Sequence, residues 1–399
     1  MLRLLVSKKI VFLVVPTSEN KFIATNKPFS QKLFWTGLLC CHFIVLALLY
    51  FKFGFNTLNE GDKYLSRATL FAGGDLVNAT QYQTFYIGYV VYLSVFVFLK
   101  TPVLLIFLST YCISLFAYYK FHQLISAYIN TETAKLWLIF ICLSPLIQYW
   151  QFNLFSETFF IAMSLLFAYV CLIPELKNRT FKIAALALIT IFSRPSGIFT
   201  IICVLLFMFY KNKVFTKKQA LLAGSVTLLI LFVGILFFFQ LPYHDFSKYI
   251  ANGSVYYGFP GWTSPELPPG NYTLIDCYQF IIDHKGIKPF LVLFIQKLNS
   301  FFLTTRPYYS DLHNYINQSH QAFYVFSIAA LFISYKKQRT VYSFLIPFLT
   351  VILLNAFMIG LIFNEWSERH TLHVFPYIIL LASYAIASLW KRYVKKQGI

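Results

Sequence analysis

Ten runs of apolar residues, each long enough or nearly long enough to cross a bilayer, follow one another along this chain of 399 residues. A transmembrane helix needs about 20 predominantly apolar residues, so this succession constrains the fold more than any other feature. The composition agrees, because 58% of the residues are hydrophobic and only 12% are charged, about half the charged fraction of a soluble domain. We predict an all-α, polytopic transmembrane helical bundle. The runs are Leu33–Phe53, Thr101–Tyr119, Lys135–Trp150, Ser156–Ile173, Phe181–Phe192, Ile198–Tyr210, Gln219–Phe239, Gln321–Tyr335, Val341–Phe363 and Thr371–Trp390.

Basic residues gather in short clusters between these runs, and their placement predicts the topology. Positively charged loops stay on the cytoplasmic side of a membrane. Five clusters should therefore be cytoplasmic, with an even number of crossings between consecutive clusters. They are Lys8/Lys9, Lys177/Arg179, Lys211–Lys218, Lys336/Lys337/Arg339 and Lys391–Lys396. Two further apolar runs, Thr84–Leu99 and Pro289–Leu303, then do not cross. We predict the first as an interfacial helix on the outer face and the second as a peripheral segment, which gives about ten spans with both termini cytoplasmic.

This topology divides the chain into a cytoplasmic N-terminal tail, residues 1–32, and a single transmembrane domain, residues 33–399. Two outer loops of that domain are large, residues 54–100 and 240–320. The formal net charge of +19 does not indicate a nucleic-acid partner, because the basic residues are scattered between spans and form no single patch. The bilayer is the partner that the charge pattern predicts.

No sequence motif indicates a cofactor. Six of the seven cysteines lie inside apolar runs, which leaves no disulfide framework and no metal-type cysteine pairing. A P-loop, a dinucleotide fingerprint and a nucleophile elbow do not occur, so chemistry driven by nucleotides is not indicated. His370 and His373 have a spacing that binds metals on a helix, but no third ligand is evident. We predict no cofactor, and a divalent metal has no support beyond this pair.

The segment Phe181–Tyr210 has basic residues at both ends, so it must enter the membrane and return. Each arm has about 13 residues and a length of roughly 20 Å, against a hydrocarbon core of about 30 Å. Arg194 at the apex should therefore lie below the outer surface, where a guanidinium needs an anionic partner or a wet cavity. We predict an outward-facing cavity in which Arg194 contacts an anionic headgroup or a substrate phosphate.

Acidic residues are few, and the informative ones lie on the predicted outer side. Asp62 closely follows the first span, where it is either a general base at the membrane surface or a solvated acid that caps a helix beginning near Lys63. Glu157 opens a span, where it either belongs to the site or complements the helix dipole. Arg306 and Arg369 stand near outer span entrances, each as a phosphate clamp, an interfacial anchor or a salt-bridge partner.

Together and in this order, these elements resemble the GT-C superfamily of membrane glycosyltransferases. The shared pattern is an acid-x-Tyr element after the first span, an interfacial helix, a pair of spans with a Ser-Glu at the outer turn, an Arg-Pro at the next outer turn, and an Arg-His before the last span. The matching residues are Asp62 and Tyr64, Pro145 with Ser156-Glu157, Arg194-Pro195, and Arg369-His370 with Pro376 beyond. The resemblance covers nearly the whole chain, and its strength lies in the order and topology of short motifs.

Members of this superfamily take a sugar from a lipid-linked phosphate donor and transfer it on the outer face, generally with the first-loop acid as the catalytic residue. The resemblance implies a polyprenyl-phosphate-sugar donor, a lipid or glycan acceptor and an enzyme in a bacterial plasma membrane. The residues that it assigns are Asp62 as the general base, Glu157 as a second acid, and Tyr64, Arg194, Arg306, Arg369 and His370 for substrate binding.

The chain departs from one subgroup of this superfamily, and two alternative functions stay open. The aminoarabinose-transferase subgroup has an acid-Lys-Pro-Pro element before its interfacial helix, where this chain has Gln81–Tyr86, so the substrate and metal details of that subgroup do not transfer. A flippase or transporter of a lipid-linked saccharide would place acids at mid-membrane, whereas this chain has them in outer loops. An O-antigen polymerase or ligase would use a large late outer loop, which residues 240–320 could supply.

Overall fold

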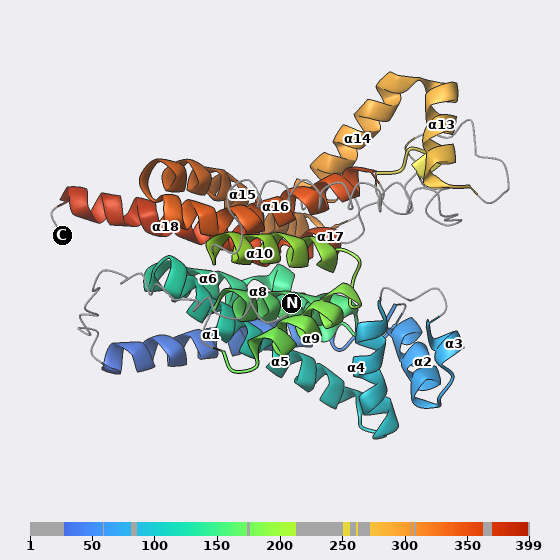
Figure 1. Cartoon of the computed structure of the whole chain (residues 1–399), viewed down its shortest axis with the longest axis horizontal. Helices are drawn as coiled ribbons and strands as arrows, with labels where there is room; N and C mark the ends of the chain where they lie inside the picture. Colours follow the sequence, from blue (N-terminus) through green and yellow to red (C-terminus); the bar gives the residue numbers. More distant parts are fainter. Residues whose placement is uncertain are drawn as a thin grey trace, which may run out of the picture.

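The computed structural model describes residues 28–58, 60–80, 86–173, 176–212, 250–255, 261, 272–303, 305–306, 309–361 and 369–397. Within these ranges the chain is helical and has no β-strand, so the predicted all-α class is confirmed (Figure 1). One isolated bridge pairs Asn56 with Asn153. The helices are α1 Pro28–Phe53, α2 Glu60–Ala72, α3 Leu76–Thr80, α4 Ile87–Phe98, α5 Val103–Tyr128, α6 Thr131–Leu143, α7 Pro145–Tyr149, the 3-10 turn η2 Trp150–Phe152, α8 Ser156–Leu172, α9 Arg179–Ile191, α10 Gly197–Lys211, α13 Leu274–Lys285, α14 Ile287–Phe302, α15 Asp311–Lys337, α16 Arg339–Leu361, α17 Arg369–Leu372 and α18 Phe375–Gln397.

Three helices among the described residues are long and apolar enough to cross a membrane, namely Lys32–Phe53 within α1, α5 and α16. A fourth span results if the segments Thr131–Leu143 and Pro145–Phe152, which are bent by 51° against each other, are counted as one. The bend occurs because Pro145 has no N–H with which to continue α6, and the Ser144 hydroxyl caps α7. Helices α4, α8 and α10 are apolar but shorter. About ten spans is therefore more than the length and composition of the described helices supply.

Several predicted segments lie outside the described residues. They include nearly all of the N-terminal tail, the apolar run Gln219–Phe239 and much of the second outer loop. The two runs that we predict not to cross lie mostly within the described part. The first forms α4, which packs against α2, α5 and α9, and the second forms α14, which packs against α13 and α16.

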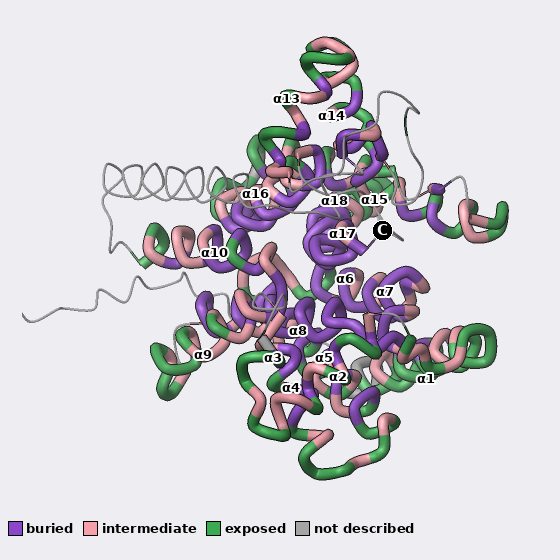
Figure 2. Tube along the Cα trace, turned by 90° about the vertical axis from the view of Figure 1, so that its right-hand side faces the viewer, coloured by how far each residue is buried: buried purple, intermediate pink, exposed green. Residues whose placement is uncertain are grey.

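Helix α8 lies at the centre of the bundle, and nearly all of its residues are buried. It packs against α5, α9 and α10. Helix α18 is buried over its first half and packs against α15 and α6, where the indole Nε1 of Trp137 donates to the carbonyl of Pro376 at 2.9 Å. Figure 2 shows buried positions at the centre and exposed positions along the outside of α1. Leu48 and Phe51 are among those exposed positions, as expected for a helix that faces lipid.

Several basic residues lie together at one end of the bundle. At one end, Lys211 donates to the Tyr128 hydroxyl at the end of α5, Arg179 donates to carbonyls at the end of α8, and Lys391 pairs with Glu132 at 3.4 Å. These basic residues belong to clusters that we predict to be cytoplasmic. Helices α2–α4 and α13–α14, from the predicted outer loops, lie at the end of the bundle away from the C-terminus (Figure 1).

Candidate functional site

The buried carboxylate of Glu157 is the centre of a charged cluster at the outer-loop end of the bundle. Its side chain is fully buried at the start of α8. Arg194 Nη1 donates to Glu157 Oε1 at 2.6 Å and to the hydroxyl of Ser156 at 3.3 Å, and Arg369 Nε donates to the same carboxylate oxygen. The side chains of both arginines are less than a tenth exposed. A carboxylate at a helix N-terminus is also favoured by the helix dipole, which helps to keep Glu157 ionised.

Arg194 reaches this carboxylate because the α9–α10 turn is unusually tight. Gly197 begins α10, and a Cβ there would lie 2.4 Å from the carbonyl oxygen of Thr190 in α9. Only glycine permits such a close approach of the two backbones. The guanidinium carbon of Arg194 lies 5.6 Å from the centre of the Tyr86 ring, which adds a cation–π contact. The turn and the ring together fix the direction of Arg194.

Arg369 links Glu157 to helix α2. Its Nη2 lies 3.6 Å from Glu60 Oε2, and its guanidinium carbon lies 5.0 Å from the centre of the Phe155 ring. The Glu60 side chain is 23% exposed, so it is the part of the cluster closest to solvent. Two arginines and two glutamates carry charges that sum to zero, and this balance makes their burial tolerable. Glu60 also pairs with the exposed Lys63, at 3.3 Å.

Helix α2 presents Glu60 and not Asp62 to the cluster. Glu60 and Tyr64 are four residues apart and share the inner face of the helix, where Tyr64 is 1% exposed. Asp62 is about 160° around the helix from Glu60 and is exposed in the first turn. The structure brings Glu157 and Arg194 together but not Asp62, and the carboxylate that α2 contributes to this cluster is Glu60. The spacing of four residues between Glu60 and Tyr64, about one helical turn, is the signal in the sequence that could have identified Glu60.

Arg306 has a different position from the one that a phosphate clamp would need. Its guanidinium donates to the carbonyls of Leu303, Thr305 and Ser300, the last at 3.1 Å. The carbonyls of Ser300 and Leu303 lie at the C-terminal end of α14, where a cation satisfies groups that have no partner within the helix, and Thr305 follows the helix. Arg306 is buried, and these contacts are those of a helix cap. This geometry fits a structural role for Arg306 better than the predicted contact with a substrate phosphate.

Unsatisfied polar atoms surround the charged cluster. Within the part of the chain that the structure describes, Glu157 Oε2, the Tyr64 hydroxyl and His373 Nε2 are buried without a hydrogen-bond partner. Burial raises the pKa of Tyr64 well above its usual value, so the group stays a neutral hydrogen-bond donor. Burial, followed by repulsion from Arg194 and Arg369, lowers the pKa of His370 well below its usual value. Buried polar atoms without partners indicate a place where a polar ligand could bind.

The described residues hold no group of three or more His, Cys, Asp or Glu side chains that could bind a metal. The rings of His370 and His373 lie nearly perpendicular to each other, with centres 6.3 Å apart. The guanidinium groups beside them would repel a cation electrostatically. The chemistry of this donor set suits an anion better than a metal ion.

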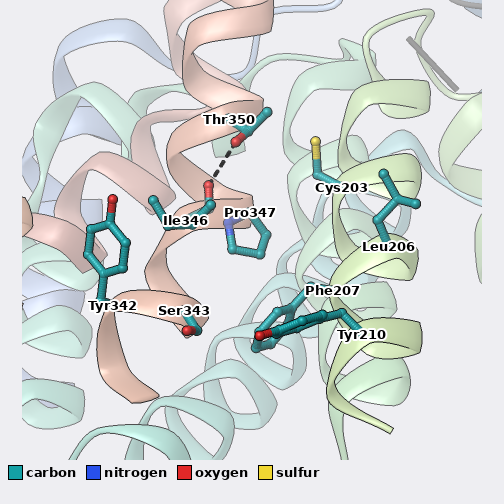
Figure 3. A pocket seen from close by; sticks show the side chains of 9 residues that line it. All are labelled: Cys203, Leu206, Phe207, Tyr210, Tyr342, Ser343, Ile346, Pro347 and Thr350. Atoms are coloured by element: carbon teal, nitrogen blue, oxygen red, sulfur yellow. Dashed lines mark hydrogen bonds between the residues drawn. The ribbon is translucent and has the colours of Figure 1, made fainter. Parts of the chain in front are cut away.

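A separate apolar cavity of about 320 Å³ lies between α10 and α16 (Figure 3). Its first lining residue on α10 is Cys203, six residues beyond Gly197, which corresponds to about 9 Å along the helix. The cavity therefore lies deeper in the bundle than the charged cluster. Its lining residues are Cys203, Leu206, Phe207, Tyr210, Tyr342, Ser343, Ile346, Pro347 and Thr350.

Comparison of the chain with protein-family models, with curated proteins and with solved structures found no match. The functional argument therefore rests on the geometry of the charged cluster. That cluster combines two guanidinium groups, a partly exposed carboxylate and buried neutral hydrogen-bond donors. Such a set can bind an anionic group and accept a proton beside it.

Proposed function

We propose that this chain is a membrane glycosyltransferase of the GT-C type that moves a sugar from a polyprenyl-phosphate donor to an acceptor on the outer face of the membrane. The observation that carries the proposal is the cluster of Glu157, Arg194, Arg369 and Glu60, buried at the end of an apolar bundle. A phosphate leaving group needs cations, and a hydroxyl acceptor needs a base. The cluster offers both kinds of group within a few ångströms of one another.

In the proposed reaction, an acceptor hydroxyl oxygen attacks the anomeric carbon of the donor sugar. The bond between that carbon and the phosphate oxygen breaks, its electron pair leaves with the polyprenyl phosphate, and the hydroxyl proton passes to a carboxylate. This single displacement inverts the anomeric centre. Arg369 and Arg194 would stabilise the negative charge that develops on the phosphate. Glu157, which is fully buried between them, would hold the two guanidinium groups in place.

Two carboxylates on α2 are candidates for the base. Asp62 is the residue that the sequence resemblance assigns, and its side chain is exposed. Glu60 is partly exposed and lies within the cluster, 3.6 Å from Arg369. A base must be within hydrogen-bond reach of the hydroxyl while the phosphate is bound. We therefore assign the base to Glu60 within this proposal and keep Asp62 as the alternative.

The lipid part of the donor has a candidate position too. The cavity between α10 and α16 is lined mainly by apolar side chains and follows Arg194 along α10. A polyprenyl chain whose phosphate binds at the cluster could extend along α10 into this cavity. The proposal further includes a bacterial plasma membrane, about ten spans and both termini in the cytoplasm, as the basic clusters indicate.

The test compares the two carboxylates of α2 in the purified full-length protein, reconstituted in nanodiscs with synthetic polyprenyl-phosphate sugars. We expect Glu60→Gln to lower the transfer rate by about two to four orders of magnitude, the usual contribution of a general base. Asp62→Asn is the matched control on the same helix and should change the rate less than about tenfold. A larger loss of transfer rate in Asp62→Asn than in Glu60→Gln would assign the general base to Asp62.

Retention of full transfer by both variants would contradict the proposed mechanism. Movement of the lipid-linked saccharide across the bilayer without any transfer of its sugar would instead favour a flippase. Sealed proteoliposomes made from the same purified protein report this movement, because nanodiscs enclose no separate compartment.

A further inference from the structure

Lys297 is, besides Arg306, a further buried basic residue outside the charged cluster. It lies on the inner face of α14 together with Leu293, Ser300 and Phe301. Its side chain is 1% exposed, and its Nζ has no hydrogen-bond partner or ion pair within the described part of the chain. Burial lowers the pKa of Lys297 from 10.5 to about 7. No carboxylate among the described residues offsets that effect of burial.

The helix that carries Lys297 contacts the helix that carries Arg369. The hydroxyl of Thr371 in α17 donates to the carbonyl of Phe301 at 2.7 Å. Phe301 is one helical turn beyond Lys297, and Thr371 is two residues beyond Arg369. The contact therefore joins the helix that carries Lys297 to the helix that carries Arg369.

Close packing on the other side holds α14 in this place. A Cβ at Gly360 in α16 would lie 2.7 Å from the Phe294 ring of α14, so the two helices approach closely there. Phe294 is about one turn before Lys297. Helix α14 is thus held between α16 and α17, and the Lys297 side chain is shielded from solvent.

The charged cluster and Lys297 differ in whether their charges are paired. Arg194 and Arg369 are paired with Glu157 and Glu60, so the cluster has no net charge. Lys297 has no counter-ion among the residues that the structure describes. An isolated ammonium in an apolar site is unfavourable, and a bound anion would remove that penalty. A lipid-linked substrate with a phosphate would bring such an anion to this end of the bundle.

We propose that Lys297 is an anion-binding residue that contacts the phosphate of the lipid-linked substrate. This assignment rests on the proposed function, because that function requires a phosphate-linked donor. Lys297 would supply the net positive charge that the neutral cluster lacks, while Arg369 and Arg194 would orient the group through directed hydrogen bonds. The polyprenyl phosphate that leaves carries more negative charge than the bound donor, so Lys297 would favour the departure.

The experiment measures binding of farnesyl phosphate, farnesol and inorganic phosphate to the full-length protein in nanodiscs by calorimetry. Lys297→Met keeps the length of the side chain and removes the charge. We expect it to weaken farnesyl phosphate binding about 10- to 100-fold, the range for a lost charge-assisted hydrogen bond. Farnesol binding should not change. Lys288→Met, an exposed lysine on the same helix, is the matched control and should bind all three probes like the wild type.

Thermal melting separates loss of binding from loss of folding. Lys297→Met removes an unpaired charge from an apolar site, so its melting temperature should equal or exceed that of the wild type. Equal binding of farnesyl phosphate by Lys297→Met and the wild type would overturn the inference, and so would a wild type that binds neither phosphate probe. Phosphate binding that depends on Lys297, in a protein that transfers no sugar, would support the anion site and remove the proposed function.

Discussion

Glu157 connects three segments that are far apart in the sequence. Its carboxylate accepts hydrogen bonds from Arg194 in the turn before α10 and from Arg369 at the start of α17, 212 positions away. Because all three side chains are almost fully enclosed, each charge depends on the others for its solvation. Glu157 is therefore expected to stabilise the fold as well as to position the arginines.

We expect Glu157→Gln to destabilise the protein by about 3 kcal/mol, because it leaves the enclosed Arg194 without a negative partner and Arg369 with Glu60 alone. Glu132→Gln is a matched control, since Glu132 also pairs with a basic residue but is 60% exposed. Exposed pairs contribute about 1 kcal/mol or less. Unfolding of the purified protein in detergent measures both variants. Equal stability of the two would contradict the structural role of Glu157.

The acid on α2 shows what residue patterns predict and what they miss. The sequence places a carboxylate-rich turn, Glu60 to Asp62, directly after the first span. It does not reveal which carboxylate faces inward, because the orientation of α2 depends on its packing against α4. Tyr64, which the acid-x-Tyr pattern singles out, is buried on that inner face. Its spacing from Glu60 is the signal that could have identified the acid that lies in the cluster.

At the scale of the elements, the hairpin of α9 and α10 agrees with the argument from length. Arms of about 13 residues cannot reach across a full bilayer, and the observed helices have 13 and 15 residues. Arg194 at the apex is 4% exposed, and Glu157 is the anionic partner that such a recessed guanidinium requires. The sequence predicted the need for a partner but not its identity, because the contact crosses between helices α8 and α10.

Gly197 is the residue on which the geometry of this hairpin depends. We expect Gly197→Ala to separate α9 from α10, because the new Cβ would meet the Thr190 carbonyl at 2.4 Å. Overpacking of this kind costs about 1–3 kcal/mol and would move Arg194 away from Glu157. Gly37→Ala in α1 is the control, since nothing lies within 4 Å of a Cβ there. Melting temperatures that fall equally in both variants would argue against this account of the turn.

The break between α6 and α7 is a difference between the structure and the prediction from apolar runs. The run Lys135–Trp150 is predicted as one span, yet the helix ends before Ser144 and turns by 51°. Proline two-thirds of the way along the run was the available signal. Hydropathy alone does not distinguish a straight span from a broken one, because both have the same composition.

At the scale of the whole molecule, the distribution of charge agrees with a membrane orientation. Basic residues of three predicted cytoplasmic clusters meet at one end, through Tyr128 and Glu132 and the last turn of α8. The elements of the two large outer loops gather at the end away from the C-terminus (Figure 1). The gathering of basic residues at one end follows from where the sequence places them between the apolar runs. The sequence could not predict that α14 would pack against α17, because that contact depends on the packing of distant helices.

The most direct test of the central claim is a profile of lipid-linked sugars in a strain that lacks this chain. Such a profile detects every lipid-linked sugar in the membrane, whichever sugar is moved and whichever acceptor receives it. The account predicts that one polyprenyl-phosphate sugar accumulates in the deletion strain, that the wild-type gene restores the normal pool, and that a gene carrying Glu60→Gln does not. An unchanged pool in the deletion strain, or full restoration by Glu60→Gln, would contradict it.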